Sequence, residues 1–110
     1  MKLDHIAIKS TNIRKSISWY KEHFCKVNIV HEDDTWGLVD ISGTKIAFVS
    51  SEQHSAHIGF EISKDQMITK FSDKVFKQHR DGTEGCYISD PDDNIIEFLV
   101  RDTDGKNKKI

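Results

Sequence analysis

Proline, cysteine and tryptophan are scarce in this sequence, and long hydrophobic runs are missing. Its 110 residues include one proline, two cysteines and two tryptophans. With 36% hydrophobic and 31% charged residues, the composition is that of a globular protein and not of a disordered chain. No apolar run approaches the roughly 20 residues that cross a bilayer, which excludes a membrane-spanning helix. The length suits one domain.

An excess of charge of one sign is also missing. The 16 basic and 18 acidic residues give a formal charge of −2, so a nucleic-acid partner is disfavoured. Asp4 and His5 interrupt the first residues before the apolar region of a signal peptide could form. We therefore expect a cytoplasmic protein with no membrane partner. Cys25 and Cys86 fit neither a disulfide framework nor a close-spaced zinc motif, and we interpret both as buried, reduced thiols.

The chain contains an internal repeat. Residues 5–8 (HIAI) recur as 57–60 (HIGF), and residues 40–49 align with 90–99 in the same order and at nearly the same offset. Two repeated segments in the same order predict two copies of one supersecondary unit. We place module one at 1–50, module two at 54–101 and a polar tail at 102–110.

Each module predicts a strand, a helix and three further strands. Asn12 is an N-cap for the first helix, and residues 63–66 have the capping-box form before the second. Alternating apolar residues indicate strands with one face covered by the helix. The fold class is therefore α+β, with two βαβββ modules forming a curved, half-open sheet cleft. Expected strands lie at 3–9, 26–31, 35–41, 44–50, 55–62, 85–89 and 94–101, and the strand before residue 85 is short or missing.

Three polar residues lie mid-strand among apolar neighbours, on the faces away from the helices: His5, His57 and Glu97. A buried polar group needs a partner, and a carboxylate needs one most. Two histidines and one carboxylate form a recurrent open metal site. Ala47 stands where the repeat would place a fourth ligand, so coordination positions stay open for water or substrate. The alternative is that both histidines are hydrogen-bonded structural residues.

The other histidines have less specific surroundings. His54 is expected in a loop, and His23 and His79 fall near helix ends, where a surface role is the default. His31 ends a strand beside acidic residues and is a candidate for the rim of the cleft. Trp36 is expected to pack on the helix-covered face.

Four segments resemble the vicinal oxygen chelate (VOC) superfamily, which includes glyoxalase I, extradiol dioxygenases, fosfomycin-resistance thiol transferases and bleomycin-binding proteins. The segments are LDHIAI at 3–8, NIRKSISWY at 12–20, HIGF at 57–60 and YISDPDDNIIEF at 87–98. The last is the most specific, because the superfamily pattern there is Asp-Pro-Asp-Gly-Asn followed by a ligating glutamate. Asp93 replaces the glycine of that pattern, which a short polar side chain tolerates at positive φ.

The resemblance implies one glyoxalase-like domain over 1–101, paired modules around a cleft, and a homodimer. It implies a divalent ion (Mn, Fe, Ni or Zn) bound by His5, His57 and Glu97. That ion would act as a Lewis acid on a small oxygen-chelating substrate in a lyase, isomerase, thiol transferase or dioxygenase reaction. Tyr87 matches a substrate-contacting tyrosine of the thiol transferases, so Tyr87 and Glu97 are the catalytic candidates.

Other features leave the function open. Ala47 departs from glyoxalase I members, which have a glutamate there. Glu61 and Lys9 are further candidates at the edges of the cleft. The alternative function is a metal-free protein that binds or sequesters a drug or metabolite in the same cleft, as bleomycin-binding members do.

Overall fold

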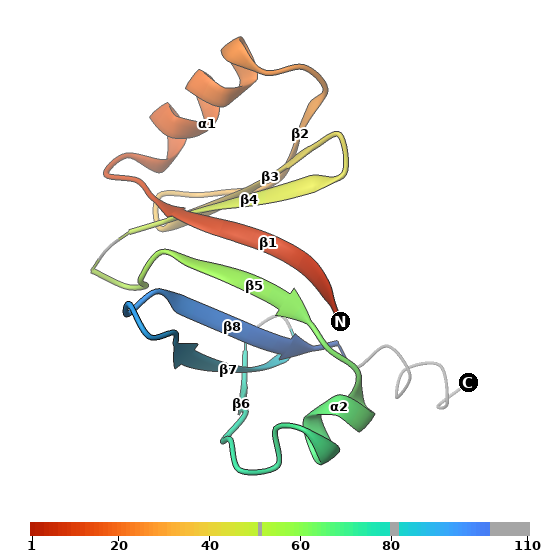
Figure 1. The fold of residues 1–110 in the computed structure, drawn as a ribbon. Coiled ribbons are helices and arrows are strands. Elements are labelled where there is room, and N and C mark those ends of the chain that lie inside the picture. Colours follow the sequence, from red (N-terminus) through yellow and green to blue (C-terminus); the bar gives the residue numbers. More distant parts are fainter. Residues whose placement is uncertain (51, 80–81, 102–110) are drawn as a thin grey trace. The chain divides into compact units, whose positions relative to one another are not determined.

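The computed structural model describes residues 1–50, 52–79 and 82–101, and its element order follows the internal repeat. A strand, a helix and three strands occur twice, so the α+β class and the βαβββ order are confirmed (Figure 1). The predicted tail at 102–110 lies outside the described residues. The elements are β1 (Lys2–Lys9), α1 (Ile13–His23), β2 (Val27–Glu32), β3 (Trp36–Ile41), β4 (Thr44–Val49), β5 (His57–Glu61), α2 (Lys64–Thr69), β6 (Lys77–Gln78), β7 (Glu84–Ser89) and β8 (Ile95–Val100).

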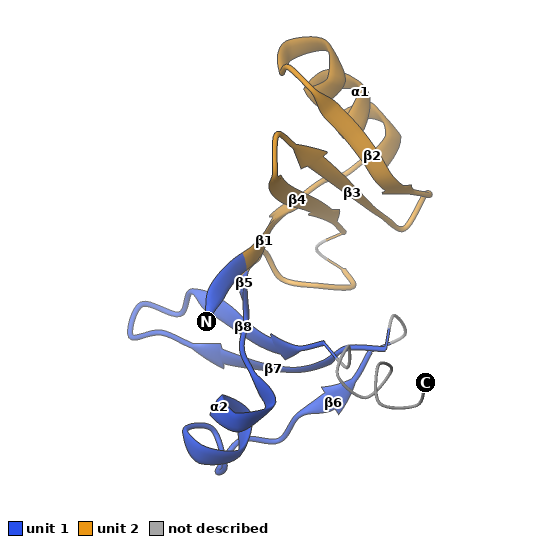
Figure 2. Cartoon of the chain, turned by 90° about the vertical axis from the view of Figure 1, so that its right-hand side faces the viewer, with its two compact units in different colours: residues 1–3, 59–110 blue, residues 4–58 orange. Residues whose placement is uncertain are grey.

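The chain divides into two compact units (Figure 2). Unit 2 comprises Asp4–Ile58, and unit 1 comprises Met1–Leu3 with Gly59–Ile110. In unit 2 the strands run in the order β2-β3-β4-β1, with β1 parallel to β4 and the other pairs antiparallel. In unit 1 the order is β5-β8-β7-β6, with β6 and β8 both antiparallel to β7.

Helix α1 covers one face of the unit 2 strands. The Asn12 side chain accepts a hydrogen bond from the Lys15 N–H at 3.1 Å, which caps the first turn. Ile17 of α1 is buried against β3 and β4, where Gly37 lets the helix approach closely. A Cβ added at Gly37 would lie 2.6 Å from Ile17 Cδ1. The buried residues of this core are Ile13, Ile17, Val39 and Phe48, joined by Ile8, Tyr20, Val27, Ile41 and Ile46.

The opposite face of the unit 2 strands carries a small apolar cluster. Ala7 on β1 lies directly opposite Ala47 on β4, and both pack with Val49 and Leu38. His5 is two residues before Ala7 and therefore shares its face. Ala47, the position where the repeat would place a fourth ligand, thus takes part in apolar packing.

Unit 1 has a second, smaller core beneath α2. Ser63 and Gln66 form the reciprocal capping box that the sequence predicts. Ile62, Phe71 and Val100 are buried, with Met67, Phe76 and Phe98 packed against them. Strand β6 has only two residues, as the short segment before β7 requires. None of the described helices is long and apolar enough to cross a bilayer.

Two expectations about packing were wrong. Cys25, which lies just after the end of α1, is exposed, whereas Cys86 is buried. Burial raises the pKa of the Cys86 thiol, which keeps it protonated. Trp36 lies at the start of β3, 36% exposed, and stacks on His31 with ring centroids 4.0 Å apart. Its indole therefore covers a histidine rather than the helix-side core.

We expect Ile17→Ala to lower the free energy of unfolding by about 2–5 kcal/mol, because it leaves a cavity in a close-packed core. Urea denaturation followed by circular dichroism measures this loss. The matched control is Ile68→Ala in α2, where Ile68 is 59% exposed. That variant should change the free energy by less than about 0.5 kcal/mol. Equal midpoints for the two variants would contradict the core assignment.

Candidate functional site

The structure brings His5 and His57 together within unit 2. His5 lies on β1 and His57 opens β5, and their Nε2 atoms are 3.0 Å apart. The ring planes are nearly perpendicular, at 87°, with centroids 5.1 Å apart. His57 is buried and His5 is partly buried. Two residues that the repeat made equivalent therefore present the same ring nitrogen to each other.

In each ring, the hydrogen-bond acceptor at Nδ1 determines which nitrogen carries the proton. His57 Nδ1 donates to the Ser55 carbonyl oxygen at 2.8 Å, because a carbonyl can only accept. His5 Nδ1 donates to Asp4 Oδ2, also at 2.8 Å. In the neutral form each ring then has a lone pair on Nε2. The tautomers follow from these acceptors.

Two lone pairs at hydrogen-bond distance repel unless something positive lies between them. Either one ring takes an extra proton or a cation accepts both lone pairs. Nitrogen atoms that each lie about 2.1 Å from one ion are about 3 Å apart when the angle at the ion is near 90°. Carboxylate and carbonyl partners on the outer nitrogen are also what metal-binding histidines usually have. The pair therefore fits a divalent ion.

Unit 1 brings Glu97 and Tyr87 together. They lie directly opposite each other on β8 and β7, so their side chains share one face of the strands. Glu97 is buried, at 4% exposed, whereas Tyr87 is 43% exposed. The sequence proposed two imidazole nitrogens and a carboxylate oxygen as metal ligands. Of these side chains, His57 and Glu97 are buried and His5 is partly buried.

His79 was expected at the surface, and this was wrong. Its Nε2 lies 3.1 Å from Glu97 Oε2, and its side chain is 29% exposed. The cause is β6, which pairs Lys77 with Gly85 and so carries His79 alongside β7, onto the face of Glu97. Sequence reasoning missed it because a two-residue strand gives no periodic signal. A sequence feature that could have indicated this close approach is Gly85, which lies on β7 just before Cys86 and Tyr87.

The comparisons with known proteins give a structural likeness without a sequence match. No protein-family model and no curated protein matches the chain. Methylmalonyl-CoA epimerase from Mycobacterium tuberculosis is similar with a TM-score of 0.71 at 16% identity, covering 96% of this chain and 91% of that one. A hypothetical protein from Bacillus halodurans C-125 scores 0.65 at 16% identity, covering 91% and 94%. A glyoxalase/bleomycin resistance protein/dioxygenase superfamily member from Vibrio splendidus 12B01 scores 0.63 at 11% identity, covering 90% and 98%.

The chain has the glyoxalase/bleomycin resistance protein/dioxygenase fold. The resemblance inferred from the four motifs is confirmed at this level, since the likeness spans nearly the whole chain.

The glyoxalase-type fold of this chain places Glu97 through the turn before β8. Asp90 Oδ1 accepts from the backbone N–H groups of Asp92 and Asn94, both at 2.9 Å, and Oδ2 accepts from Asn94 Nδ2 at 3.0 Å. The Asn94 side chain, followed by these backbone bonds, holds the pKa of Asp90 below its usual value. Asp93 has φ 66°, as expected where the superfamily pattern has glycine.

His31 is held by the turn between β2 and β3. Its Nε2 lies 2.8 Å from Asp33 Oδ2, and its ring stacks on Trp36. Asp33 also accepts from the Thr35 hydroxyl, the Thr35 N–H and the Trp36 N–H, which holds the pKa of Asp33 far below its usual range. His31 thus has a local structural partner, and its place on a cleft rim stays a prediction.

The remaining candidates contact other groups. Glu61 Oε1 lies 3.5 Å from Arg101 Nε, within ion-pair distance. Lys9 is exposed at the end of β1. His23 shares a hydrogen bond with the Trp19 carbonyl at 2.8 Å at the end of α1, so its expected surface position is confirmed. His54 is exposed in the segment before β5, outside any strand.

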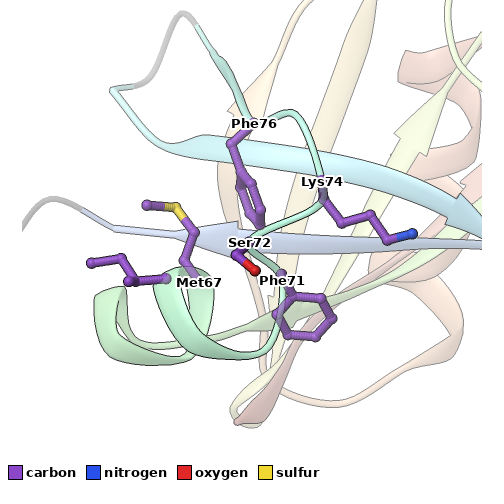
Figure 3. A pocket seen from close by; sticks show the side chains of 6 residues that line it. Met67, Phe71, Ser72, Lys74 and Phe76 are labelled. Atoms are coloured by element: carbon purple, nitrogen blue, oxygen red, sulfur yellow. The ribbon is translucent and has the colours of Figure 1, made fainter.

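A cavity of about 310 Å³ lies beside α2 in unit 1 (Figure 3). Its walls contain neither a histidine nor a carboxylate, so it does not hold the metal-ligating candidates. The lining residues are Met67, Ile68, Phe71, Ser72, Lys74 and Phe76.

Asp90→Ala should destabilise the protein in a pH-dependent way. The folded state depresses the pKa of Asp90, so its carboxylate contributes stability above its ordinary pKa and loses that contribution as the pH falls further. The difference in urea midpoint between wild type and variant should be full at pH 7 and shrink below about pH 4. Asp92→Ala, which changes an exposed side chain of the same turn, is the control. An unchanged difference between pH 7 and pH 3 would contradict this account.

Proposed function

We propose that this chain is a small divalent-metal-dependent enzyme of the glyoxalase/bleomycin resistance/dioxygenase type, with His5, His57 and Glu97 as the metal ligands. The observation that carries the proposal is the pair of Nε2 atoms 3.0 Å apart, each on a ring whose Nδ1 is occupied. A cation relieves the repulsion between these lone pairs. A buried carboxylate supplies the compensating negative charge.

The ligand types narrow the choice of ion. Imidazole nitrogens suit Fe, Ni and Zn better than calcium or magnesium, which prefer oxygen ligands, and the carboxylate oxygen in the set also suits Mn. Three protein ligands leave coordination positions for a substrate. Ala47 adds no donor, because its methyl side chain has no ligand atom, and it packs with Ala7 and Leu38. When bound, the ion supplies Lewis-acid polarisation of two substrate oxygens.

The chain's own residues would orient the reacting groups. Asp4 and Ser55 fix the rotation and tautomer of the two histidines. Tyr87, opposite Glu97 and exposed, can donate its hydroxyl proton to a substrate oxygen on that face. The reaction classes that this set can serve are those of a lyase, isomerase, thiol transferase or dioxygenase acting on a small oxygen-chelating molecule.

A metal-free binding role is the second candidate. The face of unit 2 that carries His5 also has the apolar cluster of Ala7, Ala47, Val49 and Leu38, which favours contact with a ligand of mixed polarity. Such a protein would bind its drug or metabolite equally well with and without a chelator. The metal-dependent function predicts that a chelator abolishes turnover.

His57→Ala and Glu97→Ala should each lose most of the bound metal, because each removes one of three protein ligands. Protein purified without chelators is analysed by inductively coupled plasma mass spectrometry, and wild type should hold about one ion per chain. His54→Ala is the matched control, since it changes a nearby exposed histidine. Equal metal content in all four proteins would remove the proposal.

We also propose that the chain forms a homodimer in the cytoplasm. Strand β2 lies at the end of the unit 2 strand order, with Ile29 41% and Val30 55% exposed. An uncovered apolar edge strand favours pairing with another chain. Light scattering at micromolar concentration should return about twice the 12.7 kDa of one chain. A monomer mass would refute the dimer without affecting the metal ligands.

A further inference from the structure

We propose that His79 is a positioning residue that holds the carboxylate of Glu97 in its metal-binding orientation, with Gly85 providing the space for this contact. The inference rests on the proposed function, because it assigns a second role around one of the three ligands. It concerns residues of unit 1 alone. Three observations support it: the backbone that fixes His79, the contact with Glu97, and the glycine beside both.

The backbone of His79 is fixed on both sides. Its N–H donates to the Thr83 carbonyl oxygen at 2.7 Å, and its own carbonyl accepts from the Gly82 N–H at 3.1 Å. These bonds continue the β6–β7 ladder, in which Lys77 pairs with Gly85. His79 is two residues beyond Lys77 and therefore points to the same face as Gly85, Tyr87 and Glu97.

The side chain of His79 ends on Glu97. Its Nε2 is a buried atom 3.1 Å from Glu97 Oε2, within ion-pair distance. Among the described residues His79 Nε2 has no hydrogen-bond partner, although Glu97 Oε2 is within reach. With its proton on Nε2, the imidazole would donate a hydrogen bond to Oε2 once the ring or the carboxylate turns, and we expect this bond when Glu97 binds an ion.

Gly85 makes this contact sterically possible. A Cβ at this position would overlap His79 Nε2 and lie 2.9 Å from Glu97 Oε2. The backbone of Gly85 has no positive φ that would itself demand glycine. The absence of a side chain therefore serves the approach of the imidazole to the carboxylate. Tyr87 packs edge-on against the ring, with centroids 6.3 Å apart, and so limits its rotation.

The contact has a definite chemical consequence for metal binding. A donor on one carboxylate oxygen fixes the rotation of the group and leaves the other oxygen as the ligand atom. Asp4 and Ser55 do the same for His5 and His57 through their Nδ1 atoms. His79 would give the third ligand such a partner once its ring donates to Oε2.

The test is a titration of chelator-treated protein with Mn(II), followed by electron paramagnetic resonance of free and bound ion. His79→Ala should weaken Mn(II) binding about 10–100-fold while keeping the same stoichiometry at saturation. His79→Gln should recover most of the affinity, because its amide N–H can reach the same oxygen. Gly85→Ala should also weaken binding, because the added methyl displaces the imidazole. His23→Ala, an exposed histidine in α1, is the matched control and should bind as wild type does.

The outcomes separate this inference from the proposed function. Absence of Mn(II) binding in wild type overturns both. Wild-type binding with an unchanged His79→Ala overturns the inference alone. Complete loss of binding in His79→Ala, equal to that of Glu97→Ala, makes His79 a ligand and overturns the positioning role. Equal weakening in His79→Ala and His79→Gln, with lowered melting temperatures in both, indicates a structural role and overturns it as well.

Discussion

The interaction on which the functional argument depends is the approach of two imidazole nitrogens that both carry lone pairs. His5 and His57 could each have used Nε2 as a donor, had the other nitrogen lacked an acceptor. Asp4 and the Ser55 carbonyl remove that freedom, because they hold the protons on Nδ1. What remains is a site of concentrated negative potential inside a partly buried environment. An extra proton on one ring or a cation between the two nitrogens relieves this repulsion, and the proposed metal ion is the second of these two solutions.

The fold separates packing from chemistry by the alternation of strand residues. In unit 2 the helix-covered face holds the larger core, with Ile17 and Phe48 buried, while the other face holds His5 and small apolar residues. In unit 1 the face of Phe98 packs toward the core under α2, while the face of Glu97 carries Tyr87 and His79. A one-residue shift in register would exchange these faces. The β-turns before β4 and β8 therefore fix the site as firmly as they fix the core.

The sequence predicted those features that repeat or alternate. The echo of HIAI in HIGF identified His5 and His57 as equivalent, and alternation assigned Glu97 and Tyr87 to one face. It could not predict contacts that depend on where a short or irregular segment returns to the sheet. His79 follows a two-residue strand, and Trp36 stacks on a histidine across a turn. Neither the acceptor of His5 nor that of His57 was identified, because both are local contacts without a sequence signature.

The two copies of the repeat differ at one pair of facing strand positions, which is apolar in one copy and polar in the other. Leu38 lies opposite Ala47 in unit 2, and Tyr87 lies opposite Glu97 in unit 1. These pairs correspond, since Ala47 and Glu97 align in the repeat. One pair packs with Ala7 and Val49, whereas the other presents a hydroxyl and a carboxylate and has His79 beside it. A symmetric site would have carried a fourth ligand and fewer open positions. Under the proposed function, an alanine in one copy and a carboxylate with an imidazole beside it in the other give three protein ligands and leave coordination positions for substrate oxygens.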